Sequence, residues 1–198
     1  MKIRRKYQLT KIDKKLITKK FKEQFKDFPE FVNVLNALTG NQKRGIGDMS
    51  SEELDKALRT AGFHWSSTII WAKDTLVLSR KDYHTQYEPI WYGWKSDAAR
   101  IWTVQDRKQS DLWQCDRPKR SDLHPTTKPV ELIERAVLNS SNQGVIVFEP
   151  FGGSGSTLIA CEKTGRKNRS MELDPKYCDV IVKRWEDFTG KKAELWGL

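Results

Sequence analysis

Apolar positions divide this 198-residue chain into a helical first part and a longer part that mixes strands with helices. Over 12–28, isoleucine, leucine and phenylalanine recur at roughly helical spacing between lysines, and a second helix is expected over 28–38. The loop 41–47 is rich in Gly, Lys and Arg, which makes it the best candidate boundary. After it, Ser50-Ser51-Glu52-Glu53 has the form of a capping box and predicts a helix that ends before Gly62. We therefore expect a basic helical N-terminal arm over 1–47 and an α/β domain over 48–198.

Strand patterns predominate after Phe63. The runs 68–72 and 75–78 are apolar and β-branched and predict two strands, and the aromatic run 87–95 predicts another. Alternating Trp and Tyr on such strands usually pack a core or cover a sheet face, and stacking on a nucleic-acid base is the alternative. The charged segment 101–122 is predicted to be an exposed linker.

The C-terminal third alternates helix and strand. A helix is expected after Pro129, a strand over 145–148, a helix from about Ser156 and a second strand over 169–173. Asp174 followed by a proline is a good N-cap and first-turn pair for a last helix. A strand, tight loop and helix in this order place backbone amides where a ligand can approach them.

The loop after the first of these strands is glycine-rich and preceded by an acid. Its candidate ligand-binding residues are Glu149, Pro150, Phe151, Gly152, Gly153, Ser154 and Gly155. No Gly-Lys-Ser/Thr is present, which excludes a P-loop, and Leu158 stands where a nicotinamide-binding fingerprint has its third glycine. An acid before the turn favours a cationic ligand end, such as an ammonium or sulfonium, and Glu172 could accept hydrogen bonds from ribose hydroxyls. The alternative is an ordinary glycine-rich turn.

Charge is concentrated in the arm. Of the net charge of +10, residues 1–26 carry +9, from 11 Lys or Arg against two acids. Such an arm suits contacts with nucleic-acid phosphates, and a solubilising leader is the alternative. The candidate contacts in the arm are Lys14, Lys15 and Lys19. Three widely spaced cysteines give neither a disulfide framework nor a zinc pattern, and no metal is expected. With no long apolar segment or signal peptide in the sequence, a cytoplasmic location is expected.

Several motifs together resemble the DNA amino-methyltransferases, which use S-adenosylmethionine to methylate adenine N6 or cytosine N4. They are H-P-T-x-K-P at 124–129, the glycine turn, E-L-D-P-x-Y at 172–177, W-x-K at 71–73 and the aromatic run at 87–95. The order resembles the permuted members, in which the cofactor half is C-terminal. The resemblance implies S-adenosylmethionine as cofactor and double-stranded DNA as partner, with the methionine part against the glycine turn and the ribose at Glu172. It also places Asp174, Thr126 and Lys128 near the cofactor. It suggests DNA phosphate contacts, or simply a solvated loop, for Arg107, Arg117, Lys119 and Arg120.

One family element is absent from these 198 residues. The family's D/N/S-P-P-Y/F/W tetrapeptide accepts hydrogens from the target amine and stacks the flipped base, but none of the seven prolines here is adjacent to another. No catalytic residue is therefore predicted, and Asp174-Pro175-Lys176-Tyr177 is interpreted as a helix start. We expect a partial Rossmann-like methyltransferase sheet that lacks central strands, in a methyltransferase inactive alone. The alternatives are a non-catalytic DNA- or cofactor-binding remnant, or one half of a split enzyme whose missing strands come from a second chain.

Overall fold

The computed structural model describes residues 2–3, 51–78, 80, 82–104, 108–116 and 127–195. The described residues fall into two compact units: one includes 69–90 and the chain from 101 onward, and the other includes 51–68 and 91–100. Apart from Lys2 and Ile3, the predicted arm lies outside the described residues, as does the boundary at residue 47. The proposed domain division therefore stays a prediction.

The smaller unit is built on a helix and the ends of two strands. Helix α3 (Ser51–Thr60) is the one that the capping box predicts, and it ends two residues before Gly62, whose φ is +82°. The indole of Trp91 donates to Asp55 Oδ1 on this helix at 3.1 Å, and its ring meets Phe63 edge-on. Here the aromatic run packs against the protein itself, as expected.

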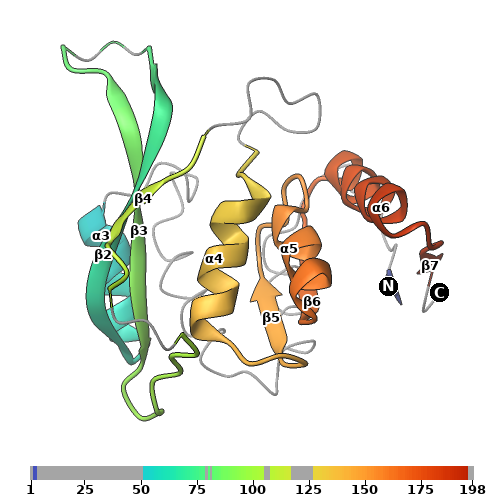
Figure 1. Cartoon of the computed structure of the whole chain (residues 1–198), viewed down its shortest axis with the longest axis horizontal. Coiled ribbons are helices and arrows are strands. Elements are labelled where there is room, and N and C mark those ends of the chain that lie inside the picture. Colours follow the sequence, from blue (N-terminus) through green and yellow to red (C-terminus); the bar gives the residue numbers. More distant parts are fainter. Residues whose placement is uncertain are drawn as a thin grey trace. The chain divides into compact units, whose positions relative to one another are not determined.

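A three-stranded sheet has the order β3-β2-β4, formed by β2 (Phe63–Val77), β3 (Thr85–Lys95) and β4 (Leu112–Gln114) (Figure 1). The prediction of two strands over 68–72 and 75–78 is wrong, because both runs belong to β2. The intervening Lys73 is buried and ion-paired, so it does not interrupt the strand. The linker prediction over 101–122 is also wrong in part: β4 lies in it, pairs in parallel with β2 and buries Trp113.

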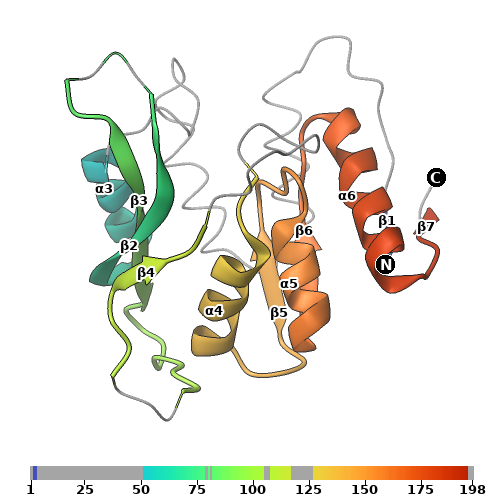
Figure 2. The ribbon, with the colours of Figure 1, turned by 45° about the horizontal axis from the view of Figure 1, so that its top comes forward.

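The C-terminal part follows the predicted alternation. Helix α4 (Val130–Ser140) precedes β5 (Ile146–Glu149), α5 (Ser156–Thr164), β6 (Lys167–Ser170) and α6 (Pro175–Thr189) (Figure 2). Strands β5 and β6 pair in parallel with α5 as their crossover, and α4 packs beside α5. The second strand ends at Ser170, so Glu172 stands in the connection after it.

The core between α5 and α6 is apolar. It contains Leu158 and Ile159 from α5 and Ile181 and Trp185 from α6. Ile181 and Trp185 lie four residues apart on one face of α6, whereas Leu158 and Ile159 are adjacent in α5, which is buried from Ser156 to Cys161. This packing fixes α6 against the N-terminal half of α5, next to the glycine turn.

A third small sheet joins β1 (Lys2–Ile3) to β7 (Glu194–Leu195) in parallel, and no sequence pattern marks it. Within the described residues the strands thus form three separate sheets, in agreement with the predicted α/β fold with a partial sheet. No helix in the described ranges has the length and apolarity needed to cross a membrane.

Candidate functional site

The turn between β5 and α5 is shaped by two left-handed glycines. Gly153 has φ +52° and Gly155, the residue before α5, has φ +78°. The turn closes on itself because Gly155 N–H donates to Gly152 O at 2.8 Å. Few residues other than glycine adopt this conformation without strain, so the glycines are a requirement of the turn.

The acid that follows β6 lies against this turn. Gly153 N–H donates to Glu172 Oε2 at 2.7 Å, although the two residues are nineteen positions apart. The other carboxylate oxygen accepts from the backbone N–H groups of Leu173 and Asp174 at 2.8 and 3.0 Å. Parallel strands end at the same edge of their sheet, and this brings together the two candidate regions that the sequence separates.

The space beside Gly153 is open. A Cβ atom built on this glycine would meet nothing nearer than Phe151 O at 3.9 Å. Neither Gly153 nor Glu172 is buried, and the side chains of Phe151 and Leu173 are 52% and 55% exposed. A ligand that approaches the turn would therefore meet the backbone of Gly153, the carboxylate of Glu172 and the apolar side chains of Phe151 and Leu173.

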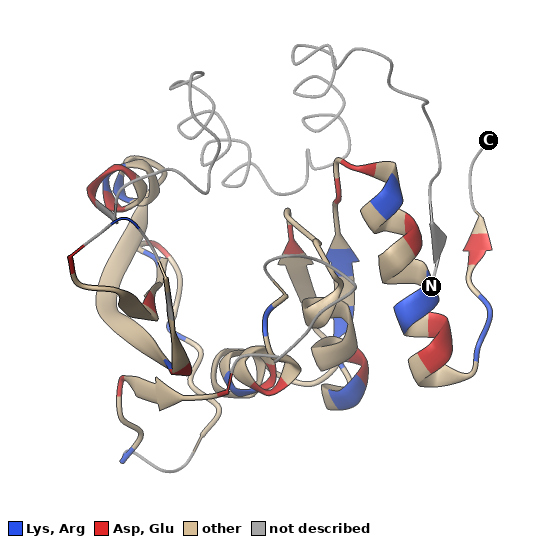
Figure 3. Ribbon diagram, turned by 90° about the horizontal axis from the view of Figure 1, so that it is seen from above, with Lys and Arg blue, Asp and Glu red and all other residues tan. Residues whose placement is uncertain are grey.

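Two acidic residues, Glu149 and Glu172, follow one another closely in space at this edge of the sheet, where Figure 3 shows red segments. Glu149, the last residue of β5, accepts from Phe151 N–H at 2.9 Å and from the Thr157 hydroxyl at 3.0 Å. Burial raises the pKa of Glu149, the charge of Glu172 raises it further, and these two hydrogen bonds oppose the shift. A cation bound here would relieve the repulsion between the two acids.

Behind the turn, buried hydroxyls connect three segments. Ser156 Oγ donates to the Lys128 backbone carbonyl at 2.7 Å and lies 3.4 Å from Ser154 Oγ. Arg184 of α6 donates to Ser154 O at 2.9 Å and to Ser156 Oγ at 3.2 Å, and burial lowers its pKa. Sequence analysis did not find Arg184, because its thirty-residue separation from Ser154 follows no period or motif.

The remaining predicted residues divide into three groups. Pro150 is half-buried inside the turn, and Asp174 caps α6 by accepting from Lys176 N–H at 2.9 Å. The ammonium of Lys128 pairs with Glu88 of β3. Outside the described residues lie Thr126 and all the predicted DNA contacts, namely Arg107, Arg117, Lys119, Arg120, Lys14, Lys15 and Lys19.

Comparison with known proteins matches this chain to one family. The DNA methylase family matches residues 45–183. The type II methyltransferase M.Cfr9I of Citrobacter freundii is 29% identical over 139 residues, covering 65% of this chain and 46% of that protein. The DNA adenine methyltransferase YhdJ of Escherichia coli K12 is 28% identical, covering 67% of this chain and 56% of its own length. This chain thus spans about half the length of the curated relatives it matches.

Among solved structures, the M1.HpyAVI–SAM complex is similar in fold and sequence. Its TM-score is 0.57 at 25% identity, and the match covers 67% of this chain and 68% of that one. The family match extends over more than half of the chain and includes both the glycine turn and Glu172. The chain therefore belongs to the DNA methylase family.

Proposed function

We propose that this chain binds S-adenosylmethionine at the turn between β5 and α5 and forms the cofactor half of a DNA amino-methyltransferase. The observation that carries this proposal is the hydrogen bond from Gly153 to Glu172. It joins the open glycine and the acid at one sheet edge, which is where nucleoside cofactors bind in α/β folds. The similarity to a methyltransferase solved with SAM supports the same assignment.

The residues of this edge fit the cofactor. S-adenosylmethionine supplies a methyl group carried on a positively charged sulfur. Glu149 and Glu172 provide negative charge for such a ligand, and Gly153 leaves room for it. The Glu172 carboxylate has about four acceptor positions, of which three are used by backbone N–H groups, so one is left for a ribose hydroxyl.

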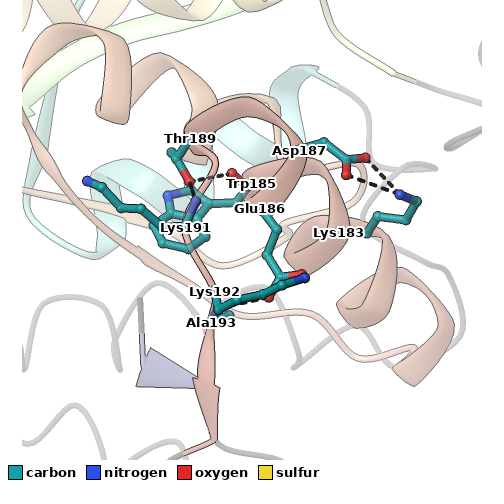
Figure 4. Close-up of polar contacts among 8 residues, drawn as sticks. All are labelled: Lys183, Trp185, Glu186, Asp187, Thr189, Lys191, Lys192 and Ala193. Carbon is teal, nitrogen blue, oxygen red and sulfur yellow. Dashed lines mark hydrogen bonds and ion pairs between the residues drawn. The ribbon is translucent and has the colours of Figure 1, made fainter.

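Binding of the cofactor is tested by calorimetric titration of the purified chain with S-adenosylmethionine. Glu172→Ala removes a charged hydrogen-bond partner, which is worth about 1.5–3 kcal/mol, or roughly ten- to a hundredfold in Kd. A matched control is Glu186→Ala, since Glu186 also accepts a backbone N–H bond, from Ala193, but lies near the other end of α6 (Figure 4). The proposal fails if the unmodified chain shows no binding, or if both variants weaken it equally.

We further propose that the chain alone does not methylate DNA, because its sequence contains no D-P-P-Y tetrapeptide to receive the target base. A second chain that brings this segment and the missing strands would complete the enzyme. The 46% exposure of Ile146 favours such a partner, because strands of a parallel sheet are normally covered on both faces.

Activity is tested by incubating the purified chain with unmethylated double-stranded DNA and labelled cofactor. We expect no label in the DNA, and transfer by the chain alone would overturn this part of the proposal. Deletion of residues 1–26 tests the proposed DNA contact of the arm. The deletion should flatten the dependence of DNA affinity on salt, and an unchanged slope would contradict it.

A further inference from the structure

A second charge cluster joins β2 and β3 to Lys128, which is its one member among the predicted site residues. Glu88 of β3 pairs with Lys73 of β2 at 2.7 Å through one carboxylate oxygen and with Lys128 through the other. Both ammonium groups stand over the ring of Trp71, at 5.1 and 5.4 Å from its centroid. The cluster thus joins W-x-K, the aromatic run and the lysine that precedes α4.

Lys73 and Lys128 differ in how far their charges depend on the carboxylate of Glu88. The side chain of Lys73 is only 7% exposed, so its charge requires a partner, but that of Lys128 is 40% exposed and could be solvated instead. Burial alone would raise the pKa of Glu88, but hydrogen bonds from both lysines hold it below its ordinary value. Glu88 is therefore ionised, and its contact with Lys128 fixes the place of that residue rather than rescuing a buried charge.

The place of Lys128 matters because its backbone holds the glycine turn. Its carbonyl accepts the hydrogen bond from Ser156, the first residue of α5, which directly follows Gly155. Ser156 is buried, and its hydroxyl also accepts a hydrogen bond from Arg184 at 3.2 Å. A movement of Lys128 would remove the acceptor of a buried hydroxyl, which costs more than the loss of an exposed contact.

We propose that Glu88 is a positioning residue for the glycine turn, acting through Lys128 and Ser156. This inference rests on the proposed function, because the turn it positions is the proposed S-adenosylmethionine site. The two ion pairs of Glu88 are with Lys73 and Lys128, neither of which belongs to the turn. Its effect reaches the cofactor only through the hydrogen bond between Ser156 and the Lys128 carbonyl.

The first test measures S-adenosylmethionine binding by calorimetry. Glu88→Gln should raise Kd about two- to thirtyfold, the range for residues that act on a site through packed neighbours. In a Ser156→Ala background the same change should have no further effect, because the connection is already broken. Glu162→Gln is the matched control: it weakens a lysine ion pair and keeps an acceptor for Trp185, and its Kd should be unchanged. Equal losses in Glu88→Gln and Glu162→Gln, or additive losses in the double variant, would overturn the proposal.

The second test does not need the cofactor. Amide hydrogen exchange over 153–159 should be faster in Glu88→Gln than in the unmodified chain, and should stay unchanged in Glu162→Gln. Lys128→Met, which alters a half-exposed side chain, is the milder variant and should have the same effect if Glu88→Gln does not fold. Unmodified protein that binds no cofactor refutes the proposed function, but unchanged exchange in both variants refutes the positioning role itself.

Discussion

Alanine substitution at each glycine of the turn between β5 and α5 separates the need for space from the need for a left-handed backbone. At Gly152, whose backbone is not left-handed, a Cβ atom would lie 2.8 Å from Ile181 Cδ1 and 3.2 Å from Met171 O. At Gly153 the space is open but φ is +52°. At Gly155 φ is +78°, and Cβ would lie 3.3 Å from both Cγ atoms of Ile181.

These environments predict a graded loss of stability. Gly153→Ala should lower stability only by the free energy needed to hold an alanine in the left-handed conformation, about 1–2 kcal/mol. Gly152→Ala overpacks a buried contact, which costs about 1–3 kcal/mol. Gly155→Ala combines the backbone cost with a tight contact against Ile181, so the largest loss is expected there, about 2–4 kcal/mol.

A second substitution identifies the atom responsible. Ile181→Val deletes Cδ1 and keeps both Cγ atoms, so it relieves the shorter of the two contacts at Gly152 and leaves those at Gly155. Urea unfolding followed by circular dichroism should show a favourable coupling of at least about 0.5 kcal/mol between Gly152→Ala and Ile181→Val. Rescue of Gly155→Ala by the same change, or no rescue of Gly152→Ala, would refute this account of the turn.

The same three variants distinguish a structural turn from a binding site. A methyl group on Gly153 would occupy the open space beside Glu172, where the cofactor is proposed to lie. Gly153→Ala should therefore combine the smallest or nearly smallest loss of stability with the largest loss of S-adenosylmethionine affinity. If the losses of affinity instead follow the losses of stability across the series, the space beside Gly153 is not a ligand site.

Three further predictions concern neighbouring side chains. Burial raises the pKa of Glu149 above its ordinary value of 4.5, so the charged side chain lowers the stability of the fold at pH values above the folded pKa. Glu149→Gln should therefore raise the unfolding midpoint at pH 7, and this gain should vanish at pH 4, where the carboxyl group is protonated in the unmodified chain. An equal gain at both pH values would contradict the shift. Asp174→Ala removes the N-cap that accepts from Lys176, and urea unfolding should report a loss of about 1 kcal/mol. Trp185→Phe removes the indole that donates to Glu162 at 3.1 Å, and a loss of about 1–3 kcal/mol is expected by the same measurement; an unchanged midpoint would argue against this hydrogen bond.

Local patterns explain why the C-terminal elements could be predicted. A β-branched run, two glycines and a capping aspartate each act within a few residues, and β5, α5 and α6 begin and end close to where these signals place them. The meeting of Gly153 with Glu172 could also be anticipated, because it follows from parallel strands sharing one edge. The same reasoning could not find Arg184 or Glu88, whose contacts with the turn and with Lys128 span 28–40 residues without any period.

The two errors in the prediction of β2 and β4 have a common cause. Lys73 and Asp74 stand between two apolar runs and look like a turn, and the charges around β4 look like a solvated loop. In β2 the charged side chain has a partner, because Lys73 pairs with Glu88. Strand β4 has no charged residue of its own, and its Trp113 is buried, with Arg135 of α4 over the ring at 4.5 Å. Periodicity treats every charge as solvent-exposed, so it misses both a strand that contains a paired charge, such as β2, and a short strand that stands among charged residues, such as β4.

The turn between β5 and α5 concentrates features that oppose folding. Burial and the nearby charge of Glu172 both raise the pKa of Glu149, so ionisation of this side chain costs free energy. A perturbed carboxyl group of this kind is typical of sites that a ligand completes, because binding returns part of what folding loses. A cation bound near these two acids would lower the pKa of Glu149 and would thereby also stabilise the fold. S-adenosylmethionine should therefore raise the unfolding midpoint more in the unmodified chain than in Glu149→Gln, and equal shifts would show that the cofactor's charge is not what this edge recognises.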